Sequence, residues 1–262
     1  MSDKLSKRIS LGCIPYINAL PFSLQLAKHK EIDLYTASPA ELLTLLIHRK
    51  LNNALTSSFG AISHKLNYLP DFGIAAHKRI LSVNLYTVPT FFNGKHTRLV
   101  STQESRSSIE LLKILCHYLW RVPIPEILRL PTHEVIQQSS DNCTGLLLIG
   151  DAALHHPKIP GFTTYDLAAG WYDLTQLPFV FAIILHNTSG KEESLLSQVF
   201  TKALNYFETH PQEVVQEAYQ RTRLPKPLLQ EYFTLCQYKL EDEHYESLAR
   251  FQTYHEALCQ SA

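Results

Sequence analysis

The sequence predicts an α/β protein in which parallel strands are covered by helices, and three observations favour this fold class. Short apolar strands, polar loops and helices follow one another repeatedly along the first two thirds of the chain. Two of the strands are continuous apolar runs, GLLLIG and LPFVFAIIL, which are typical of strands buried on both faces. The segment SPAE opens a helix with Ser as N-cap and Pro at the first helical position. This alternation implies βαβ units with right-handed crossovers.

The strands are assigned where apolar or alternating residues end at a turn signal. Several of them end directly in hydroxyl or amide residues, and ligands of such sheets bind beyond the carboxyl ends of the strands. The predicted strands are Arg8–Cys13, 31–37, Asn53–Thr56, 97–101, 126–131, 145–150 and 177–185.

The helices are assigned from caps and from apolar residues spaced three and four apart. One helix follows SPAE over 41–49, and a second runs from Ile109 to Trp120 after the polar segment STQESRSS. From about Glu192 onward the chain is predicted to be helical throughout.

Composition limits the classes of partner. The 262 residues are 45% hydrophobic and 18% charged, which is ordinary for a globular chain able to bury a core. Lys plus Arg and Asp plus Glu number 24 each, so no net charge would attract nucleic acid or a membrane surface. The polar start MSDKLSKRISLG has no signal-peptide pattern, and no window is apolar enough to span a membrane. We therefore expect a cytoplasmic protein without a nucleic-acid or membrane partner.

Metal, disulfide and nucleotide motifs are missing from the sequence. The five cysteines are scattered without CxxC spacing, which favours reduced thiols over disulfides or a zinc site. No HExxH, GxSxG, Walker loop or GxGxxG is present. We expect no metal.

The segment Ser105-Arg106-Ser107-Ser108 is the strongest local indication of a binding site. Hydroxyls and free N–H groups at a helix N-terminus bind carboxylate or phosphate, and the guanidinium can add a bidentate contact. An ordinary Ser N-cap would have the same sequence.

Other polar residues are placed where they could face a ligand, although each has an ordinary structural alternative. Asn18 lies in a loop between two prolines, where it could orient a substrate or simply make a turn. Ser57, Ser58 and Ser82 lie near strand ends. Asp151, after the run LLLIG, could be a ligand-facing carboxylate or a helix cap.

Seven segments together resemble the menaquinone-biosynthesis family that includes the chorismate dehydratases (MqnA) of the futalosine pathway. The first contains Tyr16, Asn18 and Pro21, which match the dehydratase opening and not the Pro-Asn-Asp opening of the sister enzyme that acts on cyclic dehypoxanthine futalosine. The resemblance runs from about Ile9 to Leu185 through LGCIPYINALPF, SPAELLTLL, ALTSSF, ILSVNLYT, ESRSSIELLKIL, LLLIGDAAL and YDLAAGWYDLTQLPFVFA.

Two departures from the family pattern stand out. The chain has HRKLNNA where the family commonly has glycine and then aspartate before the third strand. It also has Thr175-Gln176 where the family has threonine and glycine before LPFVFA.

The resemblance implies a periplasmic-binding-protein type II-like fold with two lobes, mixed or parallel sheets and a ligand cleft between the lobes. Residues 1–87 with 186–262 would form lobe 1, and 88–185 would form lobe 2. It implies a lyase of menaquinone biosynthesis, a hydro-lyase that dehydrates chorismate to 3-[(1-carboxyvinyl)oxy]benzoate without metal or organic cofactor.

The resemblance also suggests roles for the polar residues. Asn18 would orient the reacting ring as the catalytic residue. The serines of 105–108, with Arg106 and the helix N-terminus, would hold one carboxylate of the chorismate dianion, while Ser57, Ser58 and Ser82 would hold the other, with Asp151 as a further substrate contact.

Two readings from other classes remain open. A non-catalytic small-anion-binding protein could use the same fold, and so could the effector domain of a transcription regulator. No basic helix-turn-helix segment precedes the lobes, which argues against the regulator.

Overall fold

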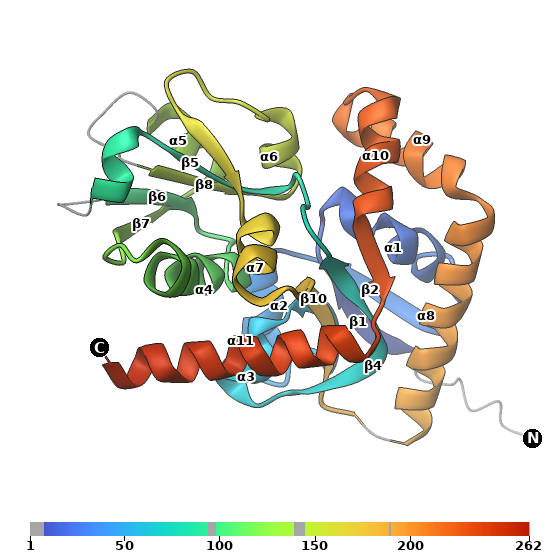
Figure 1. Ribbon diagram of the computed structural model, residues 1–262. Helices are drawn as coiled ribbons and strands as arrows, with labels where there is room; N and C mark the ends of the chain where they lie inside the picture. Colours follow the sequence, from blue (N-terminus) through green and yellow to red (C-terminus); the bar gives the residue numbers. More distant parts are fainter. Residues whose placement is uncertain (1–7, 94–97, 139–144, 189, 262) are drawn as a thin grey trace, which may run out of the picture. The chain divides into compact units, whose positions relative to one another are not determined.

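The computed structural model describes residues 8–93, 98–138, 145–188 and 190–261 (Figure 1). The chain divides into two compact units, each built from two separate stretches of sequence. Unit 1 is Met1–Phe72 with Ala182–Gln230, and unit 2 is Gly73–Phe181 with Glu231–Ala262.

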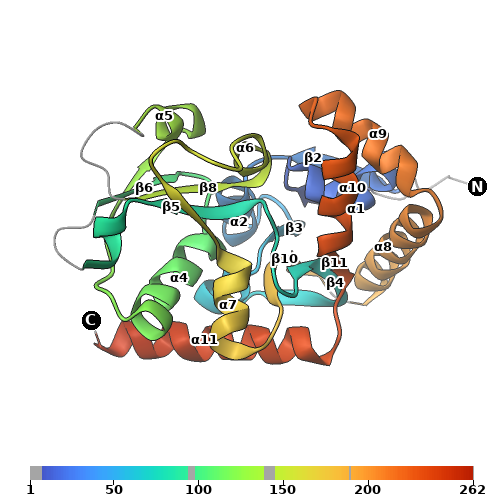
Figure 2. The same cartoon turned by 45° about the horizontal axis from the view of Figure 1, so that its top comes forward.

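This division differs from the lobes that the family resemblance suggested, 1–87 with 186–262 and 88–185. The largest difference is the C-terminal stretch, which belongs to unit 2. The reason is packing: helix α11 (Asp242–Ser261) contacts helix α4 (Ser107–Ile114), as Figure 2 shows.

Unit 1 contains the first three strands and the helices that follow them. Ser38 caps α2 by accepting a hydrogen bond from the Glu41 N–H over 3.3 Å, as SPAE predicts. The elements wholly in unit 1 are β1 (Ile9–Cys13), η1 (Ile17–Ala19), α1 (Leu20–Leu26), β2 (Ile32–Thr36), α2 (Pro39–Ile47), β3 (Asn53–Ser57), α3 (Phe59–His64), α8 (Lys191–Thr209) and α9 (Pro211–Thr222).

Unit 2 contains the central strands and α11. Its elements are β5 (Val83–Thr87), η2 (Pro89–Asn93), β6 (Arg98–Thr102), α4, the π-turn η3 (Leu115–Trp120), β7 (Glu126–Leu130), α5 (Thr132–Gln137), β8 (Gly145–Ile149), α6 (Gly150–His155), β9 (Thr163–Asp166), α7 (Leu167–Thr175), β11 (Cys236–Lys239) and α11. Three elements cross a unit boundary: β4 (Asn67–Ala76), β10 (Phe179–His186) and α10 (Lys226–Leu235).

Both sheets are mixed. The six-stranded sheet has the order β11-β4-β10-β3-β1-β2, in which β1 is parallel to β2 and β3 while β10 is antiparallel to β3. The five-stranded sheet has the order β7-β6-β8-β5-β9, in which β6 is parallel to β7 and β8 while β5 is antiparallel to β8 and β9. The predicted parallel pairs are present, but β5 and β10 run antiparallel to their neighbours, so the sheets are mixed, one of the two arrangements that the family resemblance implied.

Each unit has its own apolar core. In unit 1, Phe22, Phe72 and Phe200 pack with ring centroids 5.1–6.4 Å apart. In unit 2, one face of the five-stranded sheet packs Tyr86, Val100 and neighbouring leucines against α5. The cores explain why two sheets form, since each buries its own apolar side chains.

The predicted elements are present with shifts of one or two residues, but four strands and the helices α5 and α7 have no counterpart in the prediction. The missed strands are β4, β5, β9 and β11. Strand β11 also makes the all-helical tail wrong, because CQYK forms a short strand between two helices.

Two further expectations concern membranes and thiols. In the described part of the chain, no helix is long and apolar enough to cross a bilayer. Cys13, Cys116, Cys236 and Cys259 are free thiols, as predicted, and Cys143 lies outside the described residues.

Candidate functional site

Several buried polar groups without hydrogen-bond partners in the described structure lie at the end of β6 and the start of α4, in unit 2. Within the described ranges, Thr102 Oγ1, Ser105 Oγ and Arg106 Nε are buried and have no hydrogen-bond partner. Buried polar atoms are normally paired, so three such atoms within five residues make this segment a candidate ligand site. Ser105 and Arg106 were predicted; Thr102 was not, although a hydroxyl at a strand end was the available signal.

Helix α4 does not use a serine cap. Its N-cap residue is Arg106, which makes no side-chain cap hydrogen bond. Ser107 and Ser108 are buried first-turn residues, and Ser107 Oγ donates to the Phe181 carbonyl over 3.1 Å. The ordinary Ser N-cap is therefore wrong for this segment, and the helix start is left open to an anion.

The charges around this helix start are mainly positive. Burial, followed by the charge of Arg106, lowers the pKa of Arg129, while Glu110 acts in the opposite direction. Glu110 itself contacts Lys113 at 2.8 Å and His255 at 3.3 Å. Arg129 lies opposite Ser101 in the β6–β7 register. An anion at this helix start would thus be held by cationic side chains as well as N–H groups.

Ser82 and Asp151 lie at the same edge of the five-stranded sheet as the end of β6. Because β8 is parallel to β6 and antiparallel to β5, the ends of β6 and β8 meet the start of β5. The Gly150 N–H donates to the Ser82 carbonyl over 2.7 Å. Asp151 is the second residue of α6, whose N-cap is Ile149, so the helix-cap alternative for Asp151 is wrong.

Asp166 is a partly buried carboxylate at this edge that the sequence reasoning missed. Its Oδ2 accepts from the N–H groups of Ile80 and Leu81 at 2.7 and 2.8 Å, and its Oδ1 accepts from those of Ala168 and Ala169 at 2.9 and 3.4 Å. Burial raises the pKa of Asp166, while these N–H groups oppose the rise. The position of this Asp directly before the helix LAAGWYDLT could have predicted its role as the N-cap of α7. Nothing local could have predicted its hydrogen bonds to Ile80 and Leu81.

Unit 1 carries the remaining predicted residues at the carboxyl ends of two adjacent parallel strands. Asn18 lies in η1 just beyond β1, is 8% exposed, and its Oδ1 is buried without a partner in the described structure. Ser57 ends β3 and Ser58 follows it, and both are buried. Since β1 and β3 are parallel neighbours, these side chains belong to one sheet edge. Ser82 is not part of this group, because it lies in unit 2.

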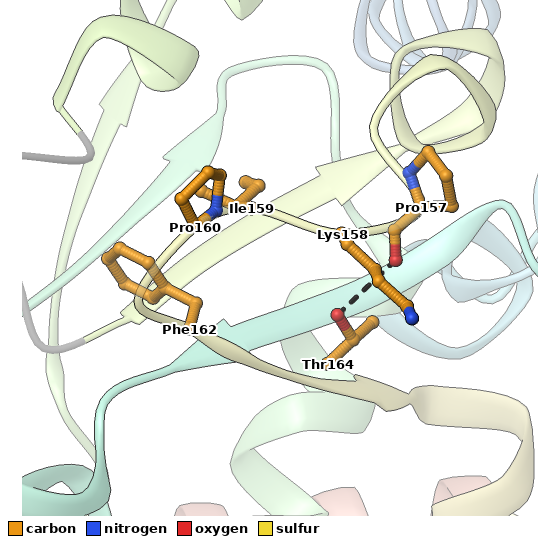
Figure 3. Close-up of a pocket in the computed structure, with 6 residues that line it drawn as sticks. All are labelled: Pro157, Lys158, Ile159, Pro160, Phe162 and Thr164. Atoms are coloured by element: carbon orange, nitrogen blue, oxygen red, sulfur yellow. Dashed lines mark hydrogen bonds between the residues drawn. The ribbon is translucent and has the colours of Figure 1, made fainter.

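Figure 3 shows a separate surface pocket of about 490 Å³ in unit 2. It is lined by Pro157, Lys158, Ile159, Pro160, Phe162 and Thr164. None of the predicted site residues lines it, and its single charged side chain is Lys158. Elsewhere, no three His, Cys, Asp or Glu residues of the described ranges are grouped as metal ligands.

Comparisons with known proteins agree on family and fold. A model of a family described as menaquinone biosynthesis matches residues 9–257. The chain is 28% identical to the chorismate dehydratase of Thermus thermophilus over 253 residues, which is 88% of this chain and 89% of that protein. It is 31% identical to the chorismate dehydratase of Campylobacter jejuni over 179 residues, 65% of this chain and 64% of that protein.

Solved structures of similar fold include binding proteins. A protein from Archaeoglobus fulgidus superposes with a TM-score of 0.81 at 14% identity, covering 98% of this chain and 99% of that one. The periplasmic aliphatic sulphonate binding protein SsuA of Escherichia coli superposes with a TM-score of 0.66 at 15% identity, covering 97% and 87%. These similarities establish the periplasmic-binding-protein-like fold that the family resemblance implied.

Proposed function

The chain belongs to the menaquinone biosynthesis family, and we propose that it is a hydro-lyase that converts chorismate to 3-[(1-carboxyvinyl)oxy]benzoate and water. The names of the two relatives from Thermus thermophilus and Campylobacter jejuni support this activity.

One structural observation carries the proposal. Thr102 Oγ1, Ser105 Oγ and Arg106 Nε are buried without partners at the uncapped start of α4. A carboxylate accepts hydrogen bonds from hydroxyl, guanidinium and N–H donors at once, so it would satisfy all three atoms. Chorismate carries two carboxylates, and we assign one of them to this group together with Ser107 and Ser108.

Substrate contacts are also proposed for the groups of unit 1. The Asn18 amide would orient the reacting ring or its hydroxyl, because an amide donates and accepts but cannot act as a base. Ser57 and Ser58 would contact the other carboxylate. Ser82 and Asp151, which share a sheet edge with the α4 group, would complete the substrate contacts from unit 2.

The main contribution of the protein to this dehydration is to orient the substrate. Loss of water makes the ring of chorismate aromatic, so much of the driving force resides in the substrate. Orientation alone can remove roughly 7–11 kcal/mol of a barrier in favourable cases. The substrate's own enolpyruvyl carboxylate is proposed to accept the ring proton while hydroxide leaves, since Asp151 beside a dianion would meet like-charge repulsion.

The direct test is to incubate the purified full chain with chorismate and to follow products by chromatography and mass spectrometry. The proposal requires a product lighter than chorismate by one water, with the absorbance of an aromatic ring. A variant carrying Ser105→Ala and Arg106→Gln is the matched control and should form it far more slowly. Chorismate that binds, as calorimetry would detect, but stays unchanged would instead identify a non-catalytic anion-binding protein.

A further inference from the structure

The backbone before β5 is held in an unfavourable conformation at a residue that is not glycine. Leu81 has φ +64°, in the left-handed region. Two hydrogen bonds from the N–H groups of Ile80 and Leu81 to Asp166 Oδ2 hold it there, and Asn84 Nδ2 donates to the Leu81 carbonyl over 2.7 Å. Strain of this kind persists only where surrounding contacts enforce it, and it concentrates at ligand-binding sites. The residue placed by this bend is Ser82.

The side chain of Ser82 is fixed as well. Tyr232 Oη donates a hydrogen bond to Ser82 Oγ over 2.9 Å, and both residues are almost completely buried, at 0% and 1% exposure. A phenol is a stronger acid than an alkyl alcohol, so it is the better donor of the two hydroxyls. With its oxygen accepting from Tyr232, Ser82 retains one O–H to donate. Apart from Tyr232 Oη itself, no acceptor for that hydrogen is found in the described part of the chain.

The Ser82 O–H could serve a ligand because Ser82 lies at the same sheet edge as the polar groups at the start of α4. Its carbonyl accepts from the Gly150 N–H, at the sheet edge where β6 ends. At the same edge lie the unpartnered atoms of Thr102, which ends β6, and of Ser105 and Arg106, which follow it. An anion bound to those atoms would offer the Ser82 O–H a charged acceptor, which is a stronger partner than a phenol oxygen.

We propose that Tyr232 and Asp166 are positioning residues that hold Ser82 as a hydrogen-bond donor to a carboxylate of the substrate. This inference rests on the proposed function for the identity of the substrate. Asp166 bends the backbone through Leu81, and Tyr232 orients the hydroxyl. Neither residue needs to touch the substrate.

The test is a double-mutant cycle with Tyr232→Phe and Ser82→Ala. Calorimetric titration of chorismate gives Kd, and turnover gives kcat. Each single variant should raise Kd about tenfold, the loss expected for a hydrogen bond to a charged group. The double variant should bind no more weakly than Ser82→Ala alone, because Tyr232 acts through Ser82. A kcat within about twofold of wild type in Tyr232→Phe completes the expected pattern.

The matched control is Ser247→Ala, which removes a buried hydroxyl of the same unit that accepts a hydrogen bond from the Trp171 indole N–H over 2.9 Å. It should leave Kd unchanged. If Tyr232→Phe still weakens binding in the Ser82→Ala background, its role is only structural and the inference fails. If the wild-type chain neither binds nor dehydrates chorismate, the proposed function fails instead.

A second experiment tests the role of Asp166 by asking whether a further substitution restores the affinity that Asp166→Asn loses. Asp166→Asn can still cap α7 through its amide oxygen but loses the acceptor for Ile80 and Leu81, so it should weaken chorismate binding. Leu81→Gly adopts the left-handed conformation without help, and adding it to Asp166→Asn should recover at least half of the lost affinity on a logarithmic scale. Absence of any rescue would overturn the positioning role of Asp166.

Discussion

The indole N–H of Trp171 donates a hydrogen bond to Ser247 Oγ over 2.9 Å, and both residues are buried. The bond joins α7 to α11 within unit 2. Ser247→Ala would leave the indole N–H buried without an acceptor. We expect the free energy of unfolding to fall by about 1–3 kcal/mol, measured by urea denaturation. Thr253→Ala, which removes an exposed hydroxyl from the same helix, is the control and should change stability by less than about 0.5 kcal/mol. Equal losses in the two variants would contradict this account.

Asn18→Ala should reduce turnover of chorismate much more than it weakens binding. The amide is assigned to orientation of the reacting ring, so its loss should appear mainly in kcat. We expect a kcat at least about 100-fold lower with Kd changed less than about fivefold. Asn52→Ala, at an exposed asparagine of the same unit, should leave both unchanged. Parallel losses in kcat and affinity would reject orientation as the role of Asn18.

Arg106→Lys should weaken chorismate binding about tenfold even though the positive charge is kept. The unpartnered atom is Nε, and lysine has no donor at that position. A hydrogen bond to a carboxylate of about 1.5 kcal/mol corresponds to this factor. Arg129→Lys, which preserves charge at an exposed neighbour, is the control and should bind within about twofold of wild type. An unchanged Kd for Arg106→Lys would mean that only charge matters there.

Gln176→Gly should stabilise the protein. Gln176 follows α7 with φ +60° and ψ +21°, a left-handed position that glycine occupies at lower cost. We expect a gain of about 1 kcal/mol in the free energy of unfolding. Gln138→Gly is the opposite control: Gln138 follows α5 as its C-cap with φ −74°, so glycine there should lower stability by making the backbone more flexible. A destabilised Gln176→Gly would show that the hydrogen bond from Gln176 Nε2 to the Tyr172 carbonyl outweighs the backbone strain.

In a Cys143→Ser background, a thiol reagent should label Cys259 quickly and the other three described cysteines only after unfolding. Burial raises the pKa values of Cys13, Cys116 and Cys236 to about 12, so their reactive thiolate forms are rare even at pH of about 9. Cys259 is exposed. Peptide mass spectrometry after brief labelling of the native protein checks the order. Rapid labelling of Cys236 would contradict the packing of β11.

The sequence predicted correctly those features that depend on interactions between residues close together in the chain. The Ser38 cap, the buried runs at β8 and β10, and the polar start of α4 all depend on neighbouring residues. Strand β4 was missed because Pro70 and Gly73 interrupt its pattern, and β11 because four residues between helices are too short to show a period. The antiparallel direction of β5 and β10 depends on partners far along the chain. The same holds for the site: Ser105 and Arg106 could be found locally, whereas the bond between Tyr232 and Ser82 joins residues 150 positions apart.

The interleaving of the two units also bears on how the protein can be made. Each unit takes one stretch from the first 181 residues and another from beyond them. A ribosome releasing the chain from its N-terminus therefore completes neither unit until about residue 230 has emerged, and unit 2 needs the stretch after that. Until residues 179–186 emerge, β3 lacks its antiparallel neighbour β10, and until residues 236–239 emerge, β4 lacks its neighbour β11. These open strand edges must be kept from aggregating. Folding is thus delayed to the last part of translation, and neither half of the sequence expressed alone should yield a folded unit.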